Sequence, residues 1–160
     1  MTVTLQTPSG AVSSAGEALM LRHAELQQVL DKWADVLATA ADRGDPVRPA
    51  KTLLRVFVTG EILPHARAEE RTLYRAGRRD PHAALLVQAL IGEHRALASR
   101  AERLAAQMQP IAVAAEAEAL SALFASHVAK EDNLLLPALE RSGANLAALI
   151  ARDRRLTGIG

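Results

Sequence analysis

The sequence contains no cysteine. This absence excludes a disulfide bond, a thiolate metal ligand and a cysteine nucleophile. A metal ion bound by this chain would therefore need ligands from His, Asp or Glu, which disfavours sites for soft metals.

Aromatic residues are also scarce, at 2% of the 160 residues, while 49% are hydrophobic and Ala, Leu, Arg and Glu dominate. This composition is typical of helices rather than strands, and the length suits one domain with a sizeable core. The first expectation is an all-α fold.

An excess of charge of one sign is missing as well. The 19 basic and 18 acidic residues are mixed along the chain and give a formal net charge of +1. Such a balance creates no positive electrostatic field that would bind the phosphates of nucleic acid or an anionic membrane. We therefore expect neither partner. We interpret the short basic run ARDRR, residues 151–155, as a solvated helix terminus rather than a binding tail.

No window approaches 18 uninterrupted apolar residues, and the start MTVTLQTPSGAVSS lacks the pattern of a signal peptide. We therefore expect a cytoplasmic protein. Residues 1–13 are rich in Thr, Ser, Gly and Pro, which predicts a flexible N-terminal arm.

Apolar residues recur at helical intervals in four long segments. Ser14 and Glu17 have the spacing of a capping box before a helix over about 15–43. Asp45-Pro46 and Asp80-Pro81 are start signals for the second and third helices, which we expect to end near residues 77 and 108. The fourth is expected from Pro110 to Leu139.

Four helices of this length, joined by short connectors, predict an up-down-up-down four-helix bundle over residues 14–140. Residues 141–160 would add a short C-terminal helix, from the apolar stretch LAALIA, and a tail. Pro64 and Pro137 fall inside the second and fourth helices, where local kinks are expected because proline lacks an N–H.

One constellation occurs twice. HARAEERTLYRA (65–76) and HVAKEDNLLLPA (127–138) align without a gap, so that His65-x3-Glu69 matches His127-x3-Glu131, 62 positions later. Upstream of each copy lies one more histidine on an apolar stripe, His23 in the first half and His94 in the second. Each half therefore contains a His followed by His-x3-Glu.

Residues at i and i+4 share one face of a helix, so each imidazole and its carboxylate can reach one metal centre. Four histidines and two glutamates buried in a core would be costly without a compensating cation. Nitrogen and hard oxygen ligands without sulfur suit iron or manganese. The predicted ligands are His23, His65, Glu69, His94, His127 and Glu131.

Several nearby residues have a simpler interpretation. A single buried histidine is usually a satisfied core residue, and it is the repetition that favours a metal. Glu70 and Asp132 lie off the face of their histidines, so we interpret them as supporting or surface groups and as reserve ligands. Tyr74, half a turn out of phase with His65, is expected to pack in the core. Surface positions are expected for Glu61 and His82.

The pattern His23, His65-x3-Glu69, His94, His127-x3-Glu131 resembles that of the hemerythrin-like proteins, over roughly residues 14–140. The resemblance implies a four-helix bundle with a non-haem di-iron centre, in which His23 and His65 serve one iron, His94 and His127 the other, and Glu69 and Glu131 bridge. Oxygen-carrying hemerythrins have a further histidine where this chain has Ala98. Their last helix uses a His-x4-Asp spacing, which His127 and Asp132 would also satisfy.

By this resemblance each of two oxo- or hydroxo-bridged irons would keep one open position. That implies a protein that binds or turns over dioxygen, hydrogen peroxide or nitric oxide, with catalase-like decomposition of peroxide as one possible activity. The alternatives are an iron- or oxygen-sensing module and an iron store without turnover. The Ala-rich surfaces of the predicted helices permit a monomer or a dimer.

Overall fold

The computed structural model describes residues 13–158, which form helices and contain no strand. The predicted all-α class is confirmed over this range, and most of the predicted N-terminal arm lies outside it. The elements are α1 (Ser14–Arg43), α2 (Arg48–Phe57), the π-helical turn η1 (Val58–Ile62), α3 (Leu63–Arg71), α4 (Leu73–Gly77), α5 (Ala84–Ala106), α6 (Pro110–Lys130), the π-helical turn η2 (Glu131–Leu135), α7 (Leu136–Arg141), α8 (Leu146–Ile150) and the 3-10 turn η3 (Arg154–Leu156).

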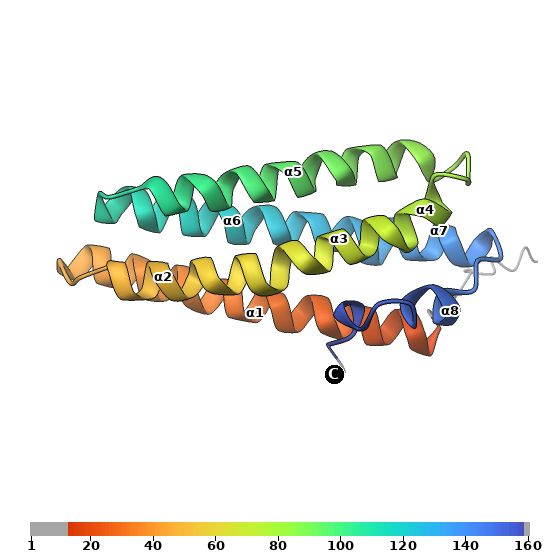
Figure 1. The fold of residues 1–160 in the computed structure, drawn as a ribbon, viewed down its shortest axis with the longest axis horizontal. Coiled ribbons are helices and arrows are strands. Elements are labelled where there is room, and N and C mark those ends of the chain that lie inside the picture. Colours follow the sequence, from red (N-terminus) through yellow and green to blue (C-terminus); the bar gives the residue numbers. More distant parts are fainter. Residues whose placement is uncertain (1–12, 159–160) are drawn as a thin grey trace, which may run out of the picture.

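Four helical rods lie side by side (Figure 1). The first and third are the continuous helices α1 and α5. The second is assembled from α2, η1, α3 and α4, and the fourth from α6, η2 and α7. The predicted short C-terminal helix is α8, which lies with η3 beside α1 and the second rod at one end of the molecule.

The helix starts differ slightly from the predicted ones. The N-cap of α1 is Ser13, whose side chain accepts a hydrogen bond from the Gly16 N–H, so the cap predicted at Ser14 is wrong by one residue. This helix ends at Gly44, whose φ of 74° favours glycine. α2 and α5 begin two or three residues later than predicted, at Arg48 and Ala84, because each Asp-Pro pair lies in the connector before the helix.

The two prolines inside the rods each follow a π-helical turn. In η1 the pattern closes with the Leu63 N–H donating to the Val58 carbonyl, and in η2 the Leu136 N–H donates to the Glu131 carbonyl. Each widened turn contains one extra residue, and this accommodates the hydrogen bond that Pro64 or Pro137 cannot donate because proline has no N–H. The disturbance expected at the prolines therefore takes the form of two widened turns.

The buried apolar side chains form two clusters. One contains Leu26, Leu97 and Phe124, and the other contains Leu19 and Leu90. His23, His65 and His94 fall where their rods pass from one cluster to the other, and in the fourth rod His127 and Glu131 lie near the same passage. A belt of buried polar side chains thus crosses the bundle between two apolar halves.

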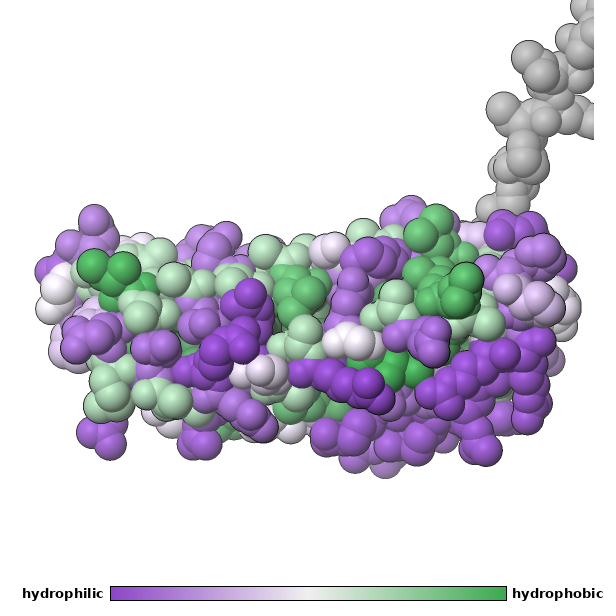
Figure 2. Space-filling view, turned by 90° about the horizontal axis from the view of Figure 1, so that it is seen from above, coloured by the Kyte–Doolittle hydropathy of each residue, from purple (hydrophilic) through white to green (hydrophobic). Residues whose placement is uncertain are grey.

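By length and composition, the helix from Pro110 to Arg141 would suffice to cross a membrane. That is weak evidence, since a helix packed in a protein core has the same character, and Val113, Leu120 and Phe124 are buried against the other rods. The expected absence of a membrane partner stays a prediction. Figure 2, which views the molecule from the side of α5, shows apolar surface in separate spots divided by hydrophilic surface.

Candidate metal centre

The structure brings the six predicted ligand residues into one buried cluster. Each rod contributes: His23 comes from α1, His65 and Glu69 from α3, His94 from α5, His127 from α6, and Glu131 from the first position of η2. None of the six is more than 5% exposed. They form two overlapping groups that could each hold a metal ion, and Glu69 belongs to both.

The first group joins His23, His65 and Glu69. The Glu69 Oε1 atom lies 3.1 Å from the His23 Nε2 atom and 2.9 Å from the His65 Nε2 atom. Two imidazole nitrogens thus converge on one carboxylate oxygen.

The second group joins His94, His127, Glu69 and Glu131. The Nε2 atoms of His94 and His127 lie 3.0 Å apart, and the other Glu69 oxygen, Oε2, lies 3.3 Å from the His94 Nε2. The Glu131 Oε2 lies 3.5 Å from the His127 Nε2 and 3.6 Å from the His23 Nε2. Each carboxylate therefore contacts histidines of both groups, as a bridging ligand must.

The opposite nitrogen of every imidazole, Nδ1, faces an oxygen atom. His23 Nδ1 lies 2.7 Å from Asp132 Oδ1, His94 Nδ1 2.8 Å from Glu70 Oε1, and His127 Nδ1 3.0 Å from Glu93 Oε2. For His65 the partner is the Arg155 main-chain carbonyl, at 2.8 Å.

A carbonyl oxygen only accepts hydrogen bonds, so Nδ1 of His65 carries a proton, and Nε2 is the ring nitrogen that faces the cluster. Ionised carboxylates favour the same tautomer at the other three rings. Metal-binding histidines in proteins nearly always show this arrangement, because the outer hydrogen bond fixes the ring and raises its basicity. Glu70 and Asp132 thus lie outside the imidazoles, in the supporting position expected of them.

Tyr74 packs in the core as predicted, but its side chain also reaches the cluster, which its predicted position out of phase with His65 did not anticipate. Its hydroxyl donates a hydrogen bond of 2.6 Å to Glu131 Oε1 and lies 3.3 Å from His94 Nε2. The prediction assumed an unbroken helix. The helix in fact breaks at Thr72, whose φ of −117° and ψ of −85° separate α3 from α4 and change the direction in which Tyr74 points.

Two buried polar atoms in the cluster, His65 Nε2 and Glu131 Oε2, have no hydrogen-bond partner among the described residues. His65 Nε2 is close to Glu69 Oε1, but the contact lacks the geometry of a hydrogen bond. Buried polar groups without partners are rare in folded proteins and call for a specific explanation. His65 belongs to the first group and Glu131 to the second, so a cation in each group would give each atom a partner, and the residues present fit a metal.

The two buried glutamates differ in their pKa values. Burial raises the pKa of Glu131 well above its ordinary value, and the charge of Glu69 raises it further. Burial acts the same way on the pKa of Glu69, but the charge of His65 and the close contacts with His23, His65 and His94 outweigh it and hold that pKa well below its ordinary value. In the absence of a cation, Glu131 therefore holds a proton more tightly than Glu69 does.

The histidines are similarly divided. Burial lowers the pKa of His23, yet Asp132, Glu69 and Glu131 raise it to about 10. For His127, burial and the nearby His94 lower the pKa to about 4. Without a cation the cluster thus balances its charge with bound protons, which a metal ion would displace.

The remaining candidates fall outside the cluster. Glu61 is exposed and forms an ion pair with Arg22, with 2.6 Å between Glu61 Oε2 and Arg22 Nη2. His82 is exposed in the connector before α5, where its main-chain N–H donates to Asp80 Oδ1. Both surface interpretations are confirmed. Besides the Tyr74 hydroxyl, Glu93 and the Arg155 carbonyl were not predicted from the sequence. The position of Glu93 directly before His94 was a usable signal.

The chain matches the model of the hemerythrin HHE cation binding domain over residues 14–139. The chain belongs to the hemerythrin HHE cation-binding family. No curated protein and no solved structure gives a significant match.

Membership in the hemerythrin family and the buried His/Glu cluster together make this protein a cation-binding module. The match spans all four rods and includes all six predicted ligand residues. The Arg155 carbonyl lies beyond the matched range.

Proposed function

We propose that this hemerythrin-family protein holds two iron ions, bridged by an oxo or hydroxo group, and that it binds or turns over dioxygen, hydrogen peroxide or nitric oxide. We take the four rods as the up-down-up-down bundle expected of the family. The observation that carries the proposal is the orientation of the four imidazoles. Each Nδ1 faces an oxygen outside the cluster, and the Nε2 atoms face two buried carboxylates.

The proposed ligands divide as the two groups do. His23 and His65 would bind one ion and His94 and His127 the other, with Glu69 and Glu131 between them. Nitrogen and carboxylate donors without sulfur favour iron or manganese over soft metals. When bound, such a pair supplies open coordination positions and a change of redox state to a small ligand.

The protein's own residues prepare the site for this chemistry. The two apolar clusters on either side keep bulk water from the ions, which strengthens every electrostatic contact within the belt. The Tyr74 hydroxyl, hydrogen-bonded to Glu131, is the proton donor nearest to that carboxylate. It can hold a proton inside the site because burial raises the pKa of Tyr74 far above its ordinary value.

Metal analysis of the protein, purified after aerobic expression with ample iron, tests the proposal. We expect about two irons per chain and the visible absorption of an oxo-bridged ferric pair. A protein that carries only zinc, or no metal, would contradict it. Sustained consumption of peroxide or oxygen by the iron-loaded protein would identify an enzyme, whereas binding without turnover would favour the alternative of a sensing module or an iron store.

A further inference from the structure

The basic run 151–155 follows the end of α8, and its arginine side chains are exposed as expected of a solvated helix terminus, but its main chain is held in place. The chain turns back after α8 and lies against α1 and α3 (Figure 1). Leu156 is fully buried in the core, the Arg155 carbonyl accepts the hydrogen bond from His65, and Asp153 Oδ2 lies 2.7 Å from Arg71 Nη2. These three contacts fix the backbone of the segment.

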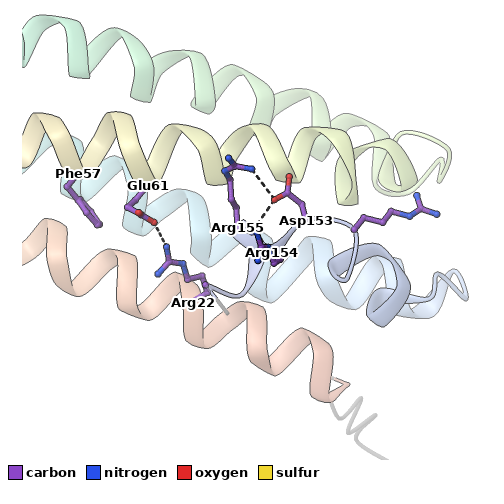
Figure 3. Close-up of a pocket in the computed structure, with 8 residues that line it drawn as sticks. Arg22, Phe57, Glu61, Asp153, Arg154 and Arg155 are labelled. Carbon is purple, nitrogen blue, oxygen red and sulfur yellow. Dashed lines mark hydrogen bonds and ion pairs between the residues drawn. The ribbon is translucent and has the colours of Figure 1, made fainter. Parts of the chain in front are cut away.

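A hollow of about 730 Å³ lies between this segment, α1 and the second rod (Figure 3). Four arginines line it: Arg22 from α1, and Arg152, Arg154 and Arg155 from the segment. Two acidic residues, Glu61 and Asp153, share the lining. The hollow has the size of a site for a small molecule, for which about 300–1,000 Å³ is typical.

The charges of the hollow are unbalanced. Four arginines against two carboxylates leave an excess of two positive charges. Both carboxylates are already engaged, Glu61 by Arg22 and Asp153 chiefly by Arg71, which is not part of the lining. Within residues 13–158, no carboxylate lies within 4 Å of the Arg152 or Arg154 side chain.

Cations without counter-charges attract anions, and a guanidinium group binds the two oxygens of a phosphate or carboxylate side by side. We propose that this hollow is a second ligand site, for a small molecule that carries two or more phosphate or carboxylate groups. Arg152 and Arg154 bind these groups, and Arg22 and Arg155 complete the basic lining.

The anion site touches the metal centre at two places. Arg22 directly precedes His23 on α1. Arg155 lines the hollow with its side chain, and its main-chain carbonyl accepts the hydrogen bond from His65. A bound anion therefore lies on the outer side of the His23 and His65 half. This site goes beyond the proposed small-molecule chemistry at iron, and its occupancy can be measured without reference to that chemistry.

Calorimetric titration of the full chain at moderate salt tests the site, with inorganic pyrophosphate as the phosphate probe and succinate as the carboxylate probe. We expect saturable one-to-one binding of at least one probe, and the probe that binds shows which oxyanion the site prefers. The variant R152Q/R154Q should weaken binding at least tenfold. A matched control, R78Q/R79Q, removes the same charge from two exposed arginines in the connector before α5 and should bind like the parent.

Pyrophosphate also binds free iron, so the iron content of the protein is measured before and after each titration. Three results would overturn the proposal: no saturable binding of either probe, equal weakening in the two double variants, or a heat that arises only while iron leaves the protein. Because all four arginines chosen are exposed, folding of both variants is expected to match the parent, and circular dichroism checks it.

Discussion

At the scale of single residues, Glu131 and Asp132 are neighbours with different positions in the cluster. Glu131 Oε2 faces imidazole nitrogens of both metal groups, whereas Asp132 reaches only the outer nitrogen of His23. We expect E131A to lose more than one iron per chain, because a bridging ligand serves both ions. D132A should weaken metal binding by roughly 10- to 100-fold, the usual effect of removing an outer partner, and keep most of its iron when iron is in excess.

Iron analysis of the two purified variants, each next to the parent, checks this difference. If D132A were stripped of metal while E131A kept it, the last helix would use the His-x4-Asp spacing of the oxygen carriers. The assignment of Glu131 as a bridge would then be wrong, and oxygen carriage would gain ground over peroxide or nitric oxide chemistry.

Tyr74 offers a second residue-scale prediction. Y74F keeps the ring, which is stacked on His94 with 5.2 Å between the ring centroids, but removes the hydroxyl that donates to Glu131. Leaving a buried carboxyl oxygen without its donor should lower the free energy of unfolding of the iron-free protein by about 1–3 kcal/mol. Denaturant unfolding measures this loss.

The control for Y74F is T59V. It removes a hydroxyl that donates to the Arg55 carbonyl on the exposed side of the second rod. Its effect should stay within about 0.5 kcal/mol, the range of ordinary surface substitutions. If Y74F and T59V lowered the free energy of unfolding equally, the hydrogen bond between Tyr74 and Glu131 would stabilise the protein no more than an exposed one does.

At the scale of elements, the two halves of the repeat support each other's histidines. Glu70, next to Glu69, holds His94 of the second half, and Asp132, next to Glu131, holds His23 of the first. Glu93, directly before His94, holds His127. The equivalent position before His23 is Arg22, which cannot accept a hydrogen bond, and the main chain of the C-terminal segment takes over that task for His65.

This asymmetry predicts the effect of shortening the chain. A protein that ends at Ala151 lacks the Arg155 carbonyl, so His65 loses the acceptor that fixes its tautomer. We expect weaker iron binding, with the first ion lost at a lower chelator concentration than in the parent. Titration with a chelator, followed by visible absorption, measures the change.

Shortening also removes the buried Leu156 side chain, and L156A separates this effect from the loss of the carbonyl. L156A should lower the free energy of unfolding by about 2–5 kcal/mol, as large-to-small substitutions in cores do. Because it keeps the Arg155 carbonyl, it should lose iron at the same chelator concentration as the parent. If L156A lost iron as readily as the shortened chain, the segment would act through packing alone.

The same elements show what could be predicted from the sequence. Helical spacing alone placed six side chains on inward faces, because i and i+4 positions share a face wherever a helix is regular. Tyr74 escaped prediction because its direction depends on the backbone break at Thr72, which no residue type announces. The Arg155 carbonyl escaped because a main-chain atom 90 positions from His65 leaves no mark in the sequence.

At the scale of the whole molecule, the polar belt lies between two apolar clusters in every rod, so the four rods meet at the site they would share with the metal. The ligands of one ion come from helices far apart in the sequence, with His23 and Glu131 separated by most of the chain. A bound ion therefore acts as a crosslink of the bundle. The unfolded chain, which cannot assemble these ligands, binds the ion far less tightly.

Removal of iron should accordingly lower the melting temperature. An ion present at about 1,000 times its dissociation constant stabilises the folded state by roughly 4 kcal/mol, and 1 kcal/mol corresponds to about 2–4 °C for a chain of this size, so we expect a fall on the order of 10 °C. Thermal unfolding followed by circular dichroism, before and after chelation with iron loss verified, measures it. In E131A, where the crosslink is already weakened, the chelator should change the melting temperature much less. If the parent melted at the same temperature with and without its iron, the metal would contribute nothing to holding the rods together, and the apolar clusters alone would account for the stability of the bundle.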